Sequence, residues 1–198
     1  KARLCFTDAS KPMKVFLMKF PKNEAHIRNV KETIRSLFNI GNHSVHINDT
    51  HEETIRLSKL VFNQNSIDYL NNSKLQYYQS LEDQLKYFKN FISQNNLNID
   101  DYCVTASSVL SMYGLRQGND LDYLHRGPTI DGHNMIHSHN EYSHGRYDKT
   151  IDDIIYNPKN HFYYGGIKFA SLNVIKSLKQ QRNEQKDIID VELINAVS

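Results

Sequence analysis

The stretch from Tyr102 to Leu124 limits the possible folds more than any other part of this chain. An apolar β-type run is followed by small residues, a short helical pattern, a glycine suited to ending that helix, and a second strand. In order, these are Tyr102–Thr105, Ala106-Ser107-Ser108, Val109–Tyr113, Gly114 and Leu121–Leu124. This order predicts an α/β (α+β) fold, with a small mixed or antiparallel sheet flanked by helices.

Hydrophobic periodicity predicts elements on both sides of this stretch. Helices are expected at 23–38, after a capping box at 50–53, at 81–92, at 172–181 and at 186–196. Strands are expected at 13–20, 44–49, 135–139 and 161–169. We expect an αβ extension over residues 1–99 and a second domain over residues 100–198.

Composition excludes several classes of protein. Apolar residues make up 39% of the 198-residue chain, enough for a core, and the formal charge is only +2. This near-neutral balance gives no strong sign of a nucleic-acid partner. Cys5 and Cys103 are too few for a disulfide framework and are interpreted as reduced, buried thiols. No apolar run is long enough to span a membrane, so a cytoplasmic location is expected.

Two carboxylates are placed for chemistry where the second strand begins. Asp120 and Asp122 are two residues apart, so on a strand both would point to one face while Leu121 points to the other. Two convergent carboxylates form a hard-oxygen site suited to Mg²⁺ (or Mn²⁺), which takes its other ligands from water and phosphate oxygens. The small residues 106–108 would let backbone N–H groups approach those phosphates.

This pattern resembles the active-site segment of the DNA polymerase β-like nucleotidyltransferase superfamily. Ala106-Ser107 is similar to its Gly-Ser turn, Asp120 and Asp122 to its metal-binding pair, and Arg116 to an arginine that holds phosphate. The tail is similar to the C-terminal helices of small bacterial members, through Lys176, Lys179, Arg182, Lys186, Asp187 and Asp190. The resemblance covers roughly residues 100–195. It implies a Mg²⁺-dependent transferase that takes a nucleotide or sugar-phosphate donor and a small-molecule acceptor, as in surface-polysaccharide or sugar modification.

The resemblance also implies a third carboxylate, for which Asp131 and Glu141 are the candidates. Ala106 departs from the family's glycine and would crowd a phosphate at the turn. Ser107, Ser108, Arg116 and Lys176 complete the expected phosphate contacts, although a solvated helix face is the simpler interpretation of Lys176, Lys179, Arg182 and Lys186.

Two other functions stay open. A degenerate domain would bind a nucleotide, a sugar phosphate or a partner protein without transfer, and it predicts that no third carboxylate reaches the pair. A His/Asp metal-dependent hydrolase would use His43, His46 and Asp49, or the histidines between 125 and 144. The chain begins at Lys1 without Met, as expected for a processed product or a piece of a longer multidomain protein.

Overall fold

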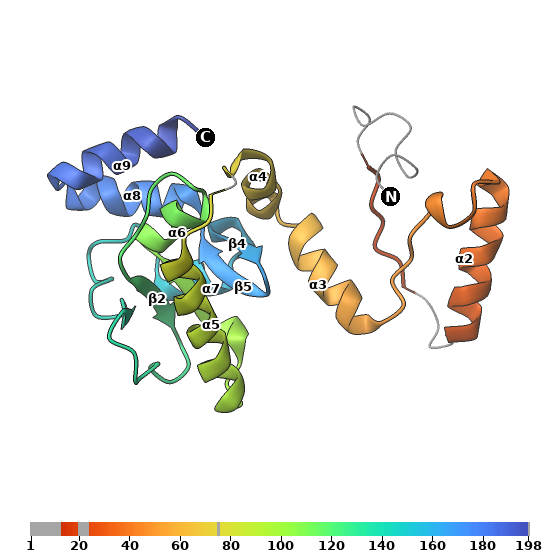
Figure 1. The fold of residues 1–198 in the computed structure, drawn as a ribbon, viewed down its shortest axis with the longest axis horizontal. Helices are drawn as coiled ribbons and strands as arrows, with labels where there is room; N and C mark the ends of the chain where they lie inside the picture. The colour runs from red at the N-terminus through yellow and green to blue at the C-terminus, as the bar shows by residue number, and fades with distance from the viewer. Residues whose placement is uncertain (1–12, 20–23, 75, 198) are drawn as a thin grey trace. The chain divides into compact units, whose positions relative to one another are not determined.

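The computed structural model describes residues 13–19, 24–74 and 76–197 (Figure 1). The chain divides after Lys59 into two compact units, residues 1–59 and 60–198. The division predicted at residue 99 therefore falls inside the second unit. Cys5, Phe20 and Asn23 lie outside the described residues. The strand predicted at 13–20 and the helix predicted at 23–38 are therefore compared with the structure over residues 13–19 and 24–38.

The first unit contains helices and irregular chain among its described residues. Helix α2 (Glu24–Phe38) and the short helix η1 (Gly41–His43) precede α3 (His51–Val61), which crosses the boundary between the units. Residues 13–19 and 44–49 form no strand, so the two strands predicted here are wrong over the described residues. A short alternating run gives a strand only where a neighbouring strand pairs with it.

The predicted capping box before α3 is present, except that the Glu53 carboxylate accepts from the backbone N–H of Asp49 and not from that of Thr50. Glu53 N donates to the Thr50 hydroxyl at 3.1 Å, and the Glu53 carboxylate accepts from Asp49 N at 3.0 Å. The helix starts where Thr50 and Glu53 predicted it, because these side chains satisfy N–H groups that the first turn leaves without partners.

The second unit is built on a five-stranded mixed sheet, in the order β3-β2-β1-β5-β4 within the described residues. Its strands are β1 (Tyr102–Thr105), β2 (Leu121–His125), β3 (Ile136–Ser138), β4 (His161–Tyr164) and β5 (Ile167–Ala170). β1 runs antiparallel to β2 and parallel to β5. The predicted mixed α/β fold is confirmed.

Helices cover both faces of this sheet. They are α4 (Gln64–Asn72), α5 (Gln79–Gln94), α6 (Ser107–Met112), α7 (Ile151–Tyr156), α8 (Leu172–Arg182) and α9 (Gln185–Asn195), with short helices η2 (Ile99–Asp101) and η3 (Pro158–Asn160). α8 and α9 pack side by side in Figure 1. The α4 and α7 helices were not predicted, whereas α5, α8 and α9 lie where the apolar periodicity placed them.

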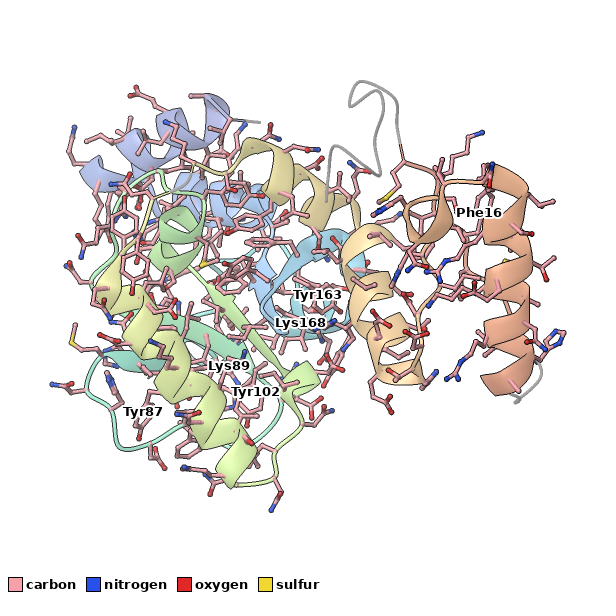
Figure 2. The ribbon with its side chains drawn as sticks, turned by 45° about the vertical axis from the view of Figure 1, so that its right-hand side comes forward. Phe16, Tyr87, Lys89, Tyr102, Tyr163 and Lys168 are labelled. Carbon is pink, nitrogen blue, oxygen red and sulfur yellow. The ribbon has the colours of Figure 1, made fainter. Side chains whose placement is uncertain are left out.

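The two faces of β1 and β2 carry different side chains. Phe88 of α5 packs edge-on against Tyr102 and Tyr123, with ring centres 6.0 and 5.6 Å away, and this defines the α5 face. The opposite face carries Thr105 and Asp122, which are cross-strand partners. On that side of β5, the buried ammonium of Lys168 donates to the Ile155 carbonyl of α7, and Figure 2 shows it beside Tyr163 of β4.

Candidate active site around Asp122

Asp122 lies directly beside the end of β1. Its register partner is Thr105, and residues opposite each other in an antiparallel pair point to the same face. The Thr105 hydroxyl shares a 2.9 Å hydrogen bond with the buried Tyr147 hydroxyl, whose pKa burial raises. The turn that follows Thr105 therefore begins next to a buried carboxylate.

The turn residue Ala106 has a backbone conformation that is usual only for glycine. Its φ is 53° and its ψ is −136°, a region in which the Cβ of an L-residue is strained. Ala106 is also 6% exposed, so the surrounding structure holds it in place.

The two serines after Ala106 are tied to the loop before β2. The Ser108 hydroxyl donates to the Asp120 carbonyl at 2.9 Å. A Cβ added to Gly118 would lie 3.0 Å from the Ser107 hydroxyl oxygen, so a larger residue there would require the Ser107 side chain to shift by a few tenths of an ångström. The turn and the start of β2 therefore form one packed unit.

The contact of His139 with Asp122 was not predicted. His139 Nε2 lies 3.0 Å from Asp122 Oδ1, and both side chains are largely buried. β2 and β3 are parallel with Asp122 opposite His137, so strand alternation brings His139 to the Asp122 face. The alternation of His137 and His139 was the available signal, but it needed the pairing of β3 with β2 to be known.

Asp120 sits at the bend before β2 and is half-exposed. Within the described residues, its carboxylate has no hydrogen bond or ion pair, and only its carbonyl is engaged, by Ser108. Its carboxylate is therefore available to a ligand, whereas that of Asp122 is already in contact with His139.

Neither predicted third carboxylate is brought to Asp122. The Asp131 carbonyl accepts from Tyr87 of α5, and the neighbouring Ile130 N donates to the Tyr123 hydroxyl, on the face opposite Asp122. Glu141 is exposed in a turn after β3. The placement of these residues does not support their predicted catalytic role.

Arg116 and the C-terminal helices form a buried charge network. Arg116 bonds both carboxylate oxygens of Asp190, at 2.5 and 2.8 Å. Lys179 is 2% exposed and lies 3.0 Å from Asp187 and 2.7 Å from Asp190. The interpretation of Lys179 as part of a solvated helix face is therefore wrong, whereas Lys176 is half-buried and Lys186 is exposed.

The carboxylates of this network are held ionised. Burial alone would raise the pKa of Asp187, but hydrogen bonds from Arg182 and Lys179 outweigh it and hold its pKa well below the usual range. The pKa of Asp190 is lowered in the same way, against burial, by Arg116 and Lys179. The Arg116 guanidinium is hydrogen-bonded to both carboxylate oxygens of Asp190. Arg116 therefore has a structural role, in which it joins the loop before β2 to α9.

His125 and Cys103 have structural roles. Both ring nitrogens of His125 are engaged, with the Gly127 carbonyl and the Ser138 hydroxyl. Burial raises the pKa of Cys103 to about 12, which makes it an unreactive thiol. Across residues 13–19, 24–74 and 76–197, no group of three or more His, Cys, Asp or Glu side chains is arranged to hold a metal ion.

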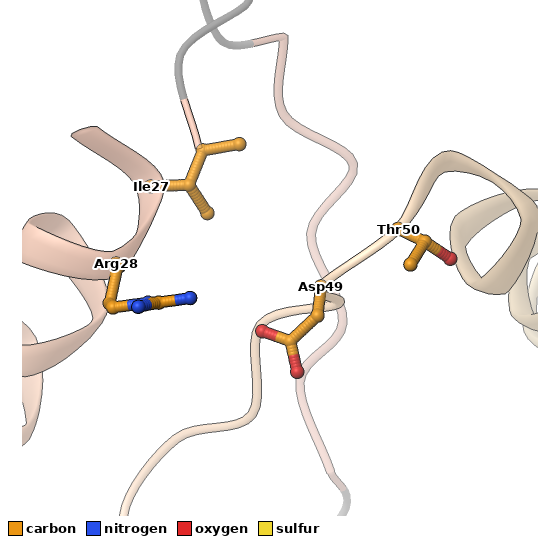
Figure 3. A pocket seen from close by; sticks show the side chains of 4 residues that line it. All are labelled: Ile27, Arg28, Asp49 and Thr50. Atoms are coloured by element: carbon orange, nitrogen blue, oxygen red, sulfur yellow. The ribbon is translucent and has the colours of Figure 1, made fainter. Parts of the chain in front are cut away.

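A polar pocket of about 260 Å³ lies in the first unit, between α2 and the start of α3 (Figure 3). Arg28 and Asp49 project into it from opposite sides, with Ile27 and Thr50 completing the lining. Lys31 donates to Asp49 at 2.9 Å, and this hydrogen bond is the main reason that the pKa of Asp49 is lowered. His46 pairs instead with Glu53, so the predicted metal set of His43, His46 and Asp49 does not assemble.

Comparisons with protein-family models, curated proteins and solved structures find no match to this chain. No helix in the described ranges is long and apolar enough to cross a membrane.

Proposed function

We propose that residues 100–198 form a Mg²⁺-dependent transferase domain. It would move a nucleotidyl or phosphoryl group from a nucleotide or sugar-phosphate donor to the hydroxyl of a small acceptor. Asp120 and Asp122 would hold the metal, and Ser107 at the start of α6 would contact the donor phosphate. Sugar or surface-polysaccharide modification is the proposed setting.

The observation that carries this proposal is the strained turn at Ala106. A non-glycine residue with φ 53° and ψ −136° costs free energy on the order of 1–3 kcal/mol, and such positions cluster at active sites and ligand clamps. This turn lies between the end of β1 and α6, with Asp122 as the register partner of the preceding residue. It is also the position at which the resembled family has its glycine.

The chemistry of the two carboxylates fits a small hard cation. Asp120 offers a free carboxylate at the surface, while Asp122 contacts His139 through one oxygen, Oδ1. Bound Mg²⁺ would take its remaining ligands from water and donor phosphates and would neutralise the charge that develops during in-line displacement. His139 would hold the Asp122 carboxylate in a fixed orientation. The acceptor hydroxyl would attack phosphorus and give its proton to water, while the bond from phosphorus to the donor's bridging oxygen breaks and this oxygen leaves with the rest of the donor.

A second function is favoured by one specific observation. Asp131 lies towards the α5 face and Glu141 lies in an exposed turn, and within the described residues Asp122 belongs to no group of three His, Cys, Asp or Glu side chains arranged for a metal ion. A domain with only two acidic ligands would bind a Mg²⁺–nucleotide complex without transferring a group. Both functions require a phosphate-bearing ligand at the same site, and turnover separates them.

A rise in melting temperature on addition of ligand tests whether a phosphate-bearing ligand binds at this site, as both functions require. The melting temperature is measured with ATP, CTP, GTP and UTP, with and without Mg²⁺, and release of pyrophosphate or nucleoside diphosphate is followed in parallel. A ligand present at 100 times its Kd adds about 2.7 kcal/mol to the free energy of unfolding. The test variant is Asp120→Asn/Asp122→Asn. Its matched control is Asp68→Asn/Asp83→Asn, because both control residues are exposed helical carboxylates.

A Mg²⁺-dependent rise in melting temperature that the test variant loses and the control keeps would support the metal–nucleotide site. Release of pyrophosphate (nucleotidyl transfer) or of nucleoside diphosphate (phosphoryl transfer) by the wild type and the control, but not by the test variant, would assign transfer. Stabilisation without release would assign the binding function. If no nucleotide stabilises the wild type, the proposal is rejected for nucleoside triphosphate donors, and nucleoside diphosphate sugars are tested in the same assay.

A further inference from the structure

The aromatic ring of Tyr142 is the second contact that holds His139. The two rings are stacked with centres 4.7 Å apart and planes inclined by 28°. His139 Nε2 lies against Asp122, and within the described residues the buried Nδ1 has no hydrogen-bond partner. The orientation of the imidazole therefore depends on the carboxylate at its edge and on the tyrosine ring at its face.

Tyr142 is itself fixed from two directions. The guanidinium carbon of Arg146 lies 3.7 Å from the centre of its ring. Arg182, at the end of α8, donates from Nη1 to the Tyr142 hydroxyl at 3.2 Å. A cation over a tyrosine ring is attracted to it, so Arg146 favours the same ring orientation as Arg182 does.

Arg182 connects this tyrosine to the buried charge network of the C-terminal helices. Its Nε donates to Asp187 Oδ2 at 2.7 Å, and its Nη2 bonds the other carboxylate oxygen. Asp187 is also paired with the buried Lys179. A continuous set of contacts therefore runs from α9 through Arg182, Tyr142 and His139 to Asp122.

We propose that Tyr142 is a positioning residue that clamps His139 against Asp122 and so fixes the direction in which this carboxylate faces a bound cation. Arg182, at the end of α8, fixes the position of Tyr142 through the hydrogen bond to its hydroxyl. The consequence for ligand binding rests on the proposed function, whereas the clamp itself is a property of the protein without ligand. Two separate readouts can therefore test them.

Histidine NMR spectra of the full chain test the clamp directly. The Hε1–Cε1 signal of His139 is assigned by its loss in His139→Gln and then compared in the wild type, Tyr142→Phe and Tyr142→Leu. Tyr77→Leu is the control, because Tyr77 is an exposed tyrosine remote in sequence from this cluster. The ring current of a stacked tyrosine displaces the His139 signal from those of exposed histidines. We expect this displacement in the wild type, Tyr142→Phe and Tyr77→Leu, and its loss in Tyr142→Leu.

Affinity for a Mg²⁺–nucleotide complex tests the consequence for the site. An aromatic stack contributes an amount that corresponds to about three- to tenfold in Kd, so Tyr142→Leu is expected to weaken binding by that factor. Tyr142→Phe keeps the ring and is expected to bind more tightly than Tyr142→Leu. An effect on folding alone would lower the melting temperature of Tyr142→Leu without changing the Kd of its folded fraction.

Each result has a defined meaning. If the His139 signal in Tyr142→Leu stays in its wild-type position, the contact between Tyr142 and His139 is rejected, independently of the measured Kd values. If the signal moves but the Kd remains within about twofold of wild type, the positioning role is rejected. If the wild type binds neither nucleoside triphosphates nor nucleoside diphosphate sugars, the proposed function is rejected, and the NMR comparison still decides whether Tyr142 clamps His139.

Discussion

The two units of this chain have equally clear helical patterns but very different burial. In the first unit, the only side chain described as buried is that of Lys31, and Phe16 is 75% exposed (labelled in Figure 2). In the second unit, Phe88, Tyr102 and Phe162 are fully buried in one hydrophobic core. Periodicity in α2 and α5 predicts an amphipathic helix in each case, but it does not show what the apolar face packs against.

This difference indicates where the stability of the chain comes from. Burial of apolar surface is the dominant favourable term in folding, and the described residues of the first unit contribute little of it. Leu37 and Phe38, at the end of α2, are both more than half exposed. We therefore expect that equivalent substitutions in the two units will have unequal effects on the free energy of unfolding.

The largest difference is expected for phenylalanine truncation. Phe88→Ala should lower the free energy of unfolding by about 3–5 kcal/mol, because it leaves a cavity between α5 and the sheet. Phe16→Ala should change it by less than about 0.5 kcal/mol, as for other exposed sites. Urea unfolding followed by circular dichroism measures both. A loss above about 2 kcal/mol in Phe16→Ala would show that Phe16 is buried in solution and would break the comparison.

A smaller contrast is expected between Lys179 and Lys31, two buried lysines that each pair with aspartate. Lys179→Met removes the cation between two buried carboxylates and should cost about 3 kcal/mol, because it leaves part of their charge uncompensated. Lys31→Met breaks a pair with Asp49, whose side chain is 75% exposed, and should cost about 1 kcal/mol or less. The same unfolding assay gives both values. Equal losses would contradict the different burial of the two pairs.

The pH dependence of the free energy of unfolding should also differ between aspartates of the two units. Asp190 has a lowered pKa in the folded state, so its contribution to stability is complete well above the ordinary carboxyl pKa of about 3.9 and is lost as pH falls below it. Each unit by which the pKa is lowered corresponds to about 1.4 kcal/mol. Between pH 6 and pH 2, Asp190→Asn should therefore lose less stability than the wild type. Asp49→Asn should follow the wild-type curve closely in 0.5 M NaCl, because Asp49 is exposed and salt screens its pair.

The smallest effect is expected at residues with positive φ. Ala106→Gly should raise the free energy of unfolding by about 1 kcal/mol, because relief of backbone strain exceeds the greater flexibility of glycine in the unfolded chain. Asn39, with a φ of 53° after α2, is a residue type that tolerates positive φ. Asn39→Gly is the matched control and should change stability by a few tenths of a kcal/mol. Destabilisation by Ala106→Gly would mean that the turn carries no strain.

Local chemistry in the sequence predicted much of the fold. Thr50 and Glu53 marked the start of α3, Gly114 has the positive φ of 67° that a residue after a helix often needs, and the apolar run 102–105 forms β1. The helix at 64–72 was missed because it contains three asparagines and a serine, residue types that favour turns and caps over helix interiors. The strand predicted at 44–49 failed because no strand pairs with it among the described residues.

The candidate site was less predictable, because it depends on contacts between distant segments. Asp122 and the turn at 106 were found from a local pattern, since β1 and β2 are joined by a short helix. His139 needed the register of β3 on β2, and the commitment of Arg116 to Asp190 needed the position of α9. Sequence spacing indicates which side chains share a face of one helix or strand, but it does not indicate which other helix or strand packs against that face.

The central position of β1 has a consequence for the order in which the protein can fold during synthesis. One neighbour, β2, follows it closely in the chain, but the other, β5, is made only after β3, α7 and β4. Until β5 leaves the ribosome, one edge of β1 has unpaired N–H and C=O groups that can pair with another chain. Late β1–β5 pairing, such as Val104 with Phe169, makes nascent or truncated chains that lack β5 prone to aggregation.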